Sequence, residues 1–151
     1  MLKYRLLHPH ILAACARAGH GSKVLISDGN YPHSTQKGDR AELVYLNLSP
    51  GKVTVTDVLQ ALVTAVPIES AEVMDYARTG PYALKEDPPV WNEFRTILRE
   101  NGYSFDLQKL ERFAFYEAAG GSDMCLTVAT GEERIYANLL LTIGVVKPAA
   151  G

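Results

Sequence analysis

The chain has 151 residues, of which 47% are hydrophobic and 21% are charged, as in one globular domain of ordinary size. This composition excludes a disordered chain and a disulfide scaffold, and the net charge of −2 argues against a dedicated nucleic-acid binder. No apolar run is long enough for a membrane span, and charge and proline interrupt the start where a signal peptide would be continuously apolar. We therefore expect a single domain over residues 1–151, in the cytoplasm, with no membrane or nucleic-acid partner.

The first half of the chain is predicted to hold two helices and three short strands. Proline at its start and glycine after its end predict a helix over Pro9–Ala18. Apolar runs predict strands over Lys23–Asp28, which closes in a turn, and over Glu42–Leu48. Thr56 is expected to cap a helix that ends near Val66, and Ala71–Met74 is the candidate for a third strand.

The second half begins with an irregular segment, Thr79–Pro89, because one glycine and three prolines leave no room for a regular element. Apolar periodicity predicts helices over Val90–Asn101 and Leu107–Ala119. Two late strands, Met124–Ala129 and Tyr136–Val146, carry apolar, β-branched runs that indicate burial on both faces.

Helices that alternate with buried strands indicate a single layered α/β/α domain with a mainly parallel sheet. In open α/β sheets, ligands bind beyond the carboxyl ends of the strands. Asp28 ends one predicted strand, and the turn Thr130-Gly131-Glu132 follows another. The sequence therefore predicts a binding site at that edge of the sheet.

All four histidines lie in the first 33 residues: His8, His10, His20 and His33. A metal site built from them and Asp28 is not favoured, because no pair has the i,i+4 spacing of helical ligands and the chain has no Cys-x-x-Cys pattern. The two cysteines, Cys15 and Cys125, are interpreted as buried thiols rather than a disulfide. We therefore expect no metal.

His20 stands between two glycines, after a predicted helix and before a predicted strand. A histidine there can donate and accept protons near neutral pH, or it can simply cap the preceding helix. Asp28 has two readings as well: it can orient an imidazole or bind ligand hydroxyls, or it can belong to an ordinary turn. Spacing alone leaves both alternatives open.

Two later segments carry polar side chains beside apolar patterns. In the helix predicted over Leu107–Ala119, one row of apolar residues is expected to face the core and to leave Arg112 and Tyr116 on another face. There the Arg112 guanidinium either reaches a polar ligand or stays solvated. That core stripe would consist of Leu107, Leu110, Phe113 and Ala114. Asn138 opens an apolar strand, and its amide either binds sugar-like hydroxyls or satisfies a turn.

Taken together, these segments resemble the RbsD/FucU family of sugar mutarotases and pyranases, and the resemblance covers most of the chain in order. The matching segments are Gly19-His20-Gly21 with Ile26-Ser27-Asp28 and Pro32-His33, then Arg112-Phe-Ala-Phe-Tyr-Glu117, then Thr130-Gly131-Glu132 with Tyr136-Ala137-Asn138. The segment from Arg112 to Glu117 is similar to the fucose mutarotase branch in particular.

The resemblance implies an RbsD-like fold and an isomerase that needs no cofactor. It implies that His20 is the catalytic acid and Asp28 a substrate contact, and that Arg112 is the sugar-binding position of the fucose branch. The remaining substrate contacts that it implies are Tyr136, Ala137 and Asn138. It also implies a ring-shaped homo-oligomer, commonly a decamer, with sites near subunit contacts and a monosaccharide as the small-molecule partner.

The implied chemistry suits these residue types. Interconversion of anomers needs a proton on the ring oxygen and loss of a proton from the anomeric hydroxyl, which general acid–base groups assist. We hypothesise that His20 donates to the ring oxygen while water or a nearby polar group takes the hydroxyl proton. The alternatives are a ribose-type pyranase, a non-catalytic sugar-binding or transport-accessory protein, and a metal hydrolase.

Overall fold

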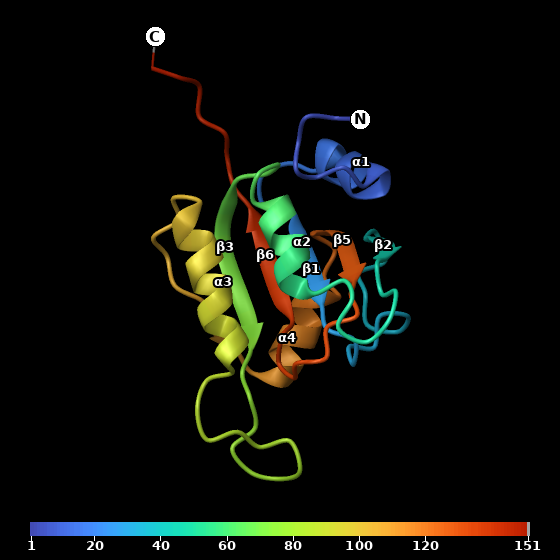
Figure 1. Ribbon diagram of the computed structural model, residues 1–151, viewed down its shortest axis with the longest axis vertical. Helices are drawn as coiled ribbons and strands as arrows, with labels where there is room; N and C mark the ends of the chain where they lie inside the picture. Colours follow the sequence, from blue (N-terminus) through green and yellow to red (C-terminus); the bar gives the residue numbers. More distant parts are fainter. Residues whose placement is uncertain (151) are drawn as a thin grey trace.

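Six strands form one sheet in the computed structural model, which describes residues 1–150. They are β1 (Lys23–Ser27), β2 (Glu42–Tyr45), β3 (Ile68–Met74), β4 (Gln108–Leu110), β5 (Met124–Ala129) and β6 (Leu139–Ile143). Their order across the sheet is β2-β5-β1-β6-β3-β4, and Figure 1 labels the first five strands of this order, from β2 to β3. Only β6 runs against its neighbours, β1 and β3, whereas the other pairs are parallel. The mainly parallel sheet predicted from the sequence is thus confirmed.

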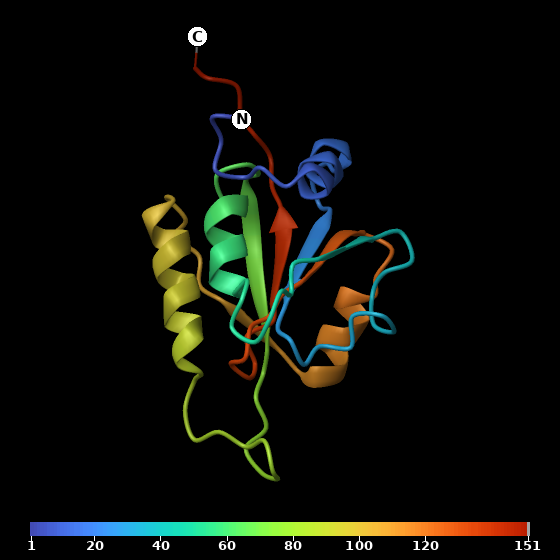
Figure 2. The ribbon, with the colours of Figure 1, turned by 45° about the vertical axis from the view of Figure 1, so that its right-hand side comes forward.

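Helices cover both faces of the sheet: α1 (Pro9–Arg17), α2 (Val55–Leu62), α3 (Pro89–Glu100) and α4 (Arg112–Ala119). Figure 2 shows α2 and α3 side by side on one face and α4 on the other. Strand side chains alternate between the faces: Val24 and Ile26 join the larger core under α1, α2 and α3, whereas Leu25 joins the core under α4. The α/β/α layering is confirmed.

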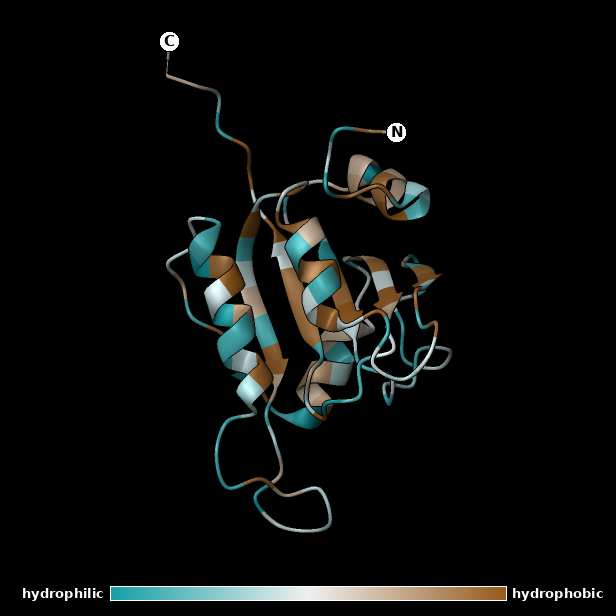
Figure 3. Cartoon of the chain, viewed as in Figure 1, coloured by the Kyte–Doolittle hydropathy of each residue, from teal (hydrophilic) through white to brown (hydrophobic). Residues whose placement is uncertain are grey.

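The central strands have no solvent-exposed face, as predicted for the two late strands. Along β6, Leu139, Leu140 and Leu141 are all buried, and β5 is buried at every position except Cys125. Figure 3 shows this as a largely hydrophobic stripe through the middle of the sheet. The strand β6 is shorter than the predicted Tyr136–Val146, because the chain leaves the sheet at Gly144.

The N-cap of helix α2 (Val55–Leu62) lies two residues before the predicted cap, Thr56. Its N-cap is Thr54, whose hydroxyl accepts a hydrogen bond from Asp57 N at 3.2 Å, while the Asp57 carboxylate accepts from Thr54 N at 2.9 Å. This reciprocal pair is a capping box. Thr56 has no acidic residue three positions later, so the sequence prediction of the cap was wrong.

The predicted helix over Leu107–Ala119 is two elements in the structure. Gln108–Leu110 forms edge strand β4, and the Glu111 carboxylate then caps α4 by accepting from Phe113 N at 2.9 Å. The later start changes which residues face the core: Phe113 is 72% exposed, and Phe115 is buried instead. The predicted core stripe was therefore wrong at Phe113 and Ala114, because the helix does not extend back to Leu107.

Neither cysteine forms a disulfide in the part of the chain that the structure describes, and both are half-buried rather than fully buried. Burial raises the pKa of the Cys15 thiol to about 11. Within residues 1–150, no helix has the length and apolarity that crossing a bilayer requires.

Candidate active site

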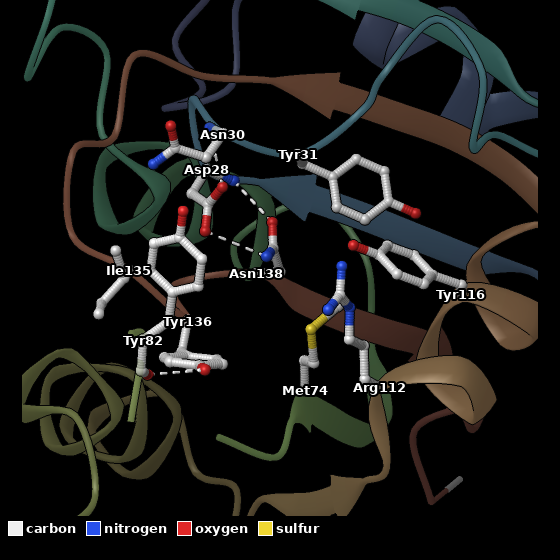
Figure 4. A pocket seen from close by; sticks show the side chains of 10 residues that line it. All are labelled: Asp28, Asn30, Tyr31, Met74, Tyr82, Arg112, Tyr116, Ile135, Tyr136 and Asn138. Atoms are coloured by element: carbon white, nitrogen blue, oxygen red, sulfur yellow. Dashed lines mark hydrogen bonds between the residues drawn. The ribbon is translucent and has the colours of Figure 1, made fainter. Parts of the chain in front are cut away.

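The topology brings three chain segments to the edge of the sheet where the parallel strands end. Asp28 follows β1 directly, Met74 ends β3, and Asn138 comes just before β6, which runs the other way. A cavity of about 350 Å³ opens at this edge, within the usual size of small-molecule sites. Its lining residues are shown in Figure 4: Asp28, Asn30, Tyr31, Met74, Tyr82, Arg112, Tyr116, Ile135, Tyr136 and Asn138.

Asp28 and Asn138 are joined by two hydrogen bonds, although they lie 110 positions apart in the sequence. The Asn138 amide donates to Asp28 Oδ2 at 3.0 Å and accepts from Asp28 N at 2.8 Å. Asp28 Oδ1 accepts from Asn30 N at 3.0 Å. The residue is only 3% exposed, and this burial raises the pKa of the Asp28 carboxyl to about 6, against the hydrogen bonds that act to lower it.

The N-terminus of α4 supplies the cationic side of the cavity. The cap at Glu111 starts the helix so that Arg112 and Tyr116, one turn apart, both line the cavity. The Arg112 guanidinium lies 5.7 Å from the centre of the Tyr116 ring, which in turn packs 5.8 Å from the ring of Tyr31. Arg112 itself is exposed, so its donors are accessible to a ligand.

Tyr136 supports the opposite wall rather than presenting a free hydroxyl. Its φ of 57° is the only positive value at a non-glycine residue in the described chain, and its carbonyl accepts from Trp91 Nε1 at 2.8 Å. Its hydroxyl donates to Tyr82 O at 3.0 Å and accepts from Ala77 N at 3.1 Å. Tyr136 thereby holds the loop that carries the exposed Tyr82 against the cavity (Figure 4).

We expect Tyr136→Phe to loosen this wall and to weaken binding of a small ligand in the cavity. Loss of two hydrogen bonds of about 1 kcal/mol each should raise KM by up to roughly 30-fold, with faster amide exchange in residues 77–84. The matched control is Tyr103→Phe, which removes a hydroxyl that accepts from Ile68 N at 3.0 Å, at the other edge of the sheet. Unchanged KM and unchanged exchange in Tyr136→Phe would refute this role.

The turn Thr130-Gly131-Glu132 does not line the cavity, but it fixes the ends of the strands that carry the site. The Thr130 hydroxyl donates to Ser27 O at 2.7 Å, which ties the ends of β5 and β1 together. A Cβ on Gly131 would collide with the carbonyl oxygens of Ser49 and Lys52, so only glycine fits. Burial acts to raise the pKa of Glu132, but hydrogen bonds from Arg134 hold it below its ordinary value.

Of the six predicted site residues, four line the cavity and two do not. Ala137 is fully buried, between Tyr136 and Asn138, and reaches no ligand through its side chain. His20 lies at the opposite edge, where its Nε2 is 2.6 Å from Glu69 Oε2 at the start of β3. The five residues of β1 alone span about 13 Å, so His20 cannot reach the cavity of its own chain.

Each of the other three histidines has a hydrogen-bond or ion-pair partner of its own. His8 caps α1, and His10 lies 3.0 Å from Glu42. His33 Nδ1 lies 2.9 Å from the hydroxyl of Ser27, whose proton has the carbonyl of Val128 as an acceptor at 3.1 Å. Within residues 1–150, no three histidine, cysteine, aspartate or glutamate side chains gather as a metal site would require.

Several lining residues were not singled out from the sequence, above all Tyr31 and Tyr82. Tyr31 comes three residues after Asp28 in the same turn, so its proximity to the site was a signal that could have been used. Tyr82 lies in the segment predicted as irregular. An aromatic residue in such a loop could have been considered a candidate ligand contact. Its contact with Tyr136 bridges 54 residues, which no local pattern predicts.

Comparison with known proteins agrees with the fold and with the family resemblance. The model of the RbsD / FucU transport protein family matches residues 1–146. The chain belongs to this family. Among RbsD/FucU relatives, the fucose mutarotase of Homo sapiens is 34% identical over 147 residues, covering 93% of this chain and 90% of that protein. The fucose mutarotase of Danio rerio is 31% identical over 148 residues, covering 95% and 92%.

A solved RbsD/FucU structure has the same fold. The fucose mutarotase of Streptococcus pneumoniae, crystallised in complex with L-fucose, aligns with a TM-score of 0.81 and covers 97% of this chain and 100% of that one. At 24% identity, this likeness establishes the shared architecture of the RbsD/FucU domain.

Proposed function

We propose that this protein is a monosaccharide mutarotase that interconverts the anomers of a fucose-like sugar. The observation that carries the proposal is the cavity in which Asp28, Arg112 and Asn138 converge from three separate elements. Carboxylate, guanidinium and amide groups together offer the donors and acceptors that sugar hydroxyls need. The relatives at 31% and 34% identity that are fucose mutarotases support the same assignment.

The reaction opens and recloses the sugar ring. A proton must reach the ring oxygen as the anomeric hydroxyl loses its own, and the resulting aldehyde then rotates about C1–C2 before closure on its other face. We assign proton donation to His20. Because His20 lies at the opposite edge of the sheet from its own cavity, it must act on the cavity of a second copy of the chain.

A homo-oligomer follows from this assignment, and the family resemblance suggests a decamer. The exposure of the His20 and Glu69 side chains, 57% and 53%, supports it, because both are available to a neighbouring copy. The exposed Tyr45 and Leu48, on and beyond edge strand β2, offer further apolar surface for assembly. Two free thiols agree with a reducing compartment such as the cytoplasm.

A ribose-type pyranase is the second candidate, since the family includes RbsD and the same ring opening converts pyranose into furanose. The experiment that separates the candidates is NMR magnetisation exchange on a panel with L-fucose, D-ribose and related sugars. We expect enzyme-dependent exchange between the α and β pyranose signals, strongest for fucose-like sugars. Exchange confined to pyranose–furanose signals of ribose would favour the pyranase, and binding without exchange would favour a sugar-binding protein.

A further inference from the structure

We propose that Asp28 is not only a substrate contact but the second acid–base group of the reaction, taking the proton from the anomeric hydroxyl. This inference rests on the proposed function and deepens it. It names a catalytic residue supplied by the same chain that forms the cavity, opposite a proton donor supplied by another copy.

The composition of the cavity wall leaves few alternatives. Asp28 is the only carboxyl among the ten lining residues, and no lining residue is a histidine, lysine or cysteine. A guanidinium group offers donors but no acceptor, and side-chain amides do not exchange protons usefully. A neutral phenol is a poor proton acceptor, and burial raises the pKa of Tyr31 above its ordinary value.

The hydrogen bonds around Asp28 hold the carboxylate in place without neutralising it. Each oxygen accepts one bond from an uncharged donor, Oδ1 from Asn30 N and Oδ2 from the Asn138 amide. None of the ion pairs in residues 1–150 includes Asp28. Since a carboxylate has about four lone-pair positions, acceptor capacity remains for a substrate hydroxyl.

The environment of Asp28 also suits proton exchange near neutral pH. Burial raises its pKa to about 6, close to where a group that must both take and return a proton works best. The nearby charge of Glu132 acts in the same direction. The other titratable or charged groups that face the cavity are Tyr31, Tyr82, Arg112, Tyr116 and Tyr136.

The proton balance closes over one cycle. The Asp28 carboxylate removes the proton from O1, the C1–O5 bond breaks, C1–O1 becomes a carbonyl, and O5 accepts a proton from His20 of the neighbouring copy. After rotation about C1–C2, O5 attacks the other face of the aldehyde and returns its proton to His20. The protonated Asp28 returns its proton to O1, so neither sugar nor protein changes its net charge.

The test is the Asp28→Asn variant, which keeps the shape and removes the titrating group, measured by NMR exchange against the wild-type protein. We expect kcat to fall roughly 10²–10⁴-fold with little change in KM. The kcat of the wild-type protein should fall as pH drops through about 6, and the residual activity of the variant should lack this dependence. The matched control is Asp123→Asn, at the other edge of the sheet beside Lys23, which should keep wild-type rates.

The outcomes distinguish a failure of the inference about Asp28 from a failure of the proposed mutarotase function. If Asp28→Asn raises KM and leaves kcat unchanged, Asp28 only holds the sugar, and the inference is overturned while the mutarotase function stands. If His20→Gln abolishes exchange but Asp28→Asn does not, the inference fails in the same way. If the wild-type protein exchanges no sugar of the panel, the proposed function and the inference fail together.

Discussion

Two inactive variants of this protein are expected to recover activity when they assemble together. His20→Ala and Asp28→Asn should each lose roughly 10²–10⁴-fold in exchange rate, because each removes one acid–base group. In a randomly mixed oligomer, about one quarter of the sites would pair an intact His20 with an intact cavity, if the two come from different copies. Co-expression of differently tagged chains, tandem purification and NMR exchange would measure the recovery.

The physical reason lies in the two edges of the sheet. His20 precedes β1 and its partner Glu69 lies at the start of β3, whereas Asp28 and Arg112 follow β1 and β4. One copy therefore cannot bring both His20 and Asp28 to one sugar. Mixed oligomers with no more activity than the separate variants would contradict a shared site. His20→Ala with full activity would instead remove His20 from the mechanism.

The second large effect concerns stability, where Asp28→Asn should make the protein more stable at pH 7. Because burial raises the pKa of folded Asp28 from 3.8 to about 6, the folded state keeps a proton that the unfolded state loses in this range. Stability should therefore fall as pH rises from about 4 to about 6, and stay level above it. This pKa shift corresponds to a destabilisation of the folded wild-type protein by about 3 kcal/mol at pH 7. The variant avoids this destabilisation but loses one hydrogen bond, which reduces its gain in stability by about 1 kcal/mol.

The measurement is thermal unfolding of wild-type protein and Asp28→Asn at pH 4 and pH 7, at equal concentration. A net gain of about 2 kcal/mol should raise Tm by roughly 4–8 °C at pH 7, with no gain at pH 4. An equal or lower Tm for the variant at pH 7 would show that the carboxylate is not strained by burial. An inactive variant that is more stable than the wild type would mark Asp28 as a residue retained for function.

Local sequence patterns were sufficient to predict the helices and strands that are marked by terminal proline and glycine or by a continuous apolar run. The helix α1, with proline first and glycine beyond its end, and strand β5 were predicted within one residue of their bounds. The carboxyl-edge position of Asp28 followed from the end of a single apolar strand. The start of α4 was missed, because the three residues of β4 form a strand only by pairing with β3.

The site itself depends on long-range pairing that the sequence does not display. Asn138 meets Asp28 only because β6 inserts antiparallel between β1 and β3, and the prediction of a mainly parallel sheet did not specify this. The same topology places His20 away from the cavity, although only eight positions separate it from Asp28 in the sequence. Residue types therefore indicated which polar groups could form a site, but they could not predict which of these groups share one cavity.

A crystal structure of the assembled protein with its fastest-exchanging sugar is the most direct test of this account. We predict the sugar in the cavity at the carboxyl edge, with its anomeric hydroxyl within hydrogen-bond distance of the Asp28 carboxylate and Arg112 on its other hydroxyls. His20 of a neighbouring copy should lie beside the ring oxygen. A sugar bound at the opposite edge, next to His20 and Glu69 of one copy and away from Asp28, would contradict it.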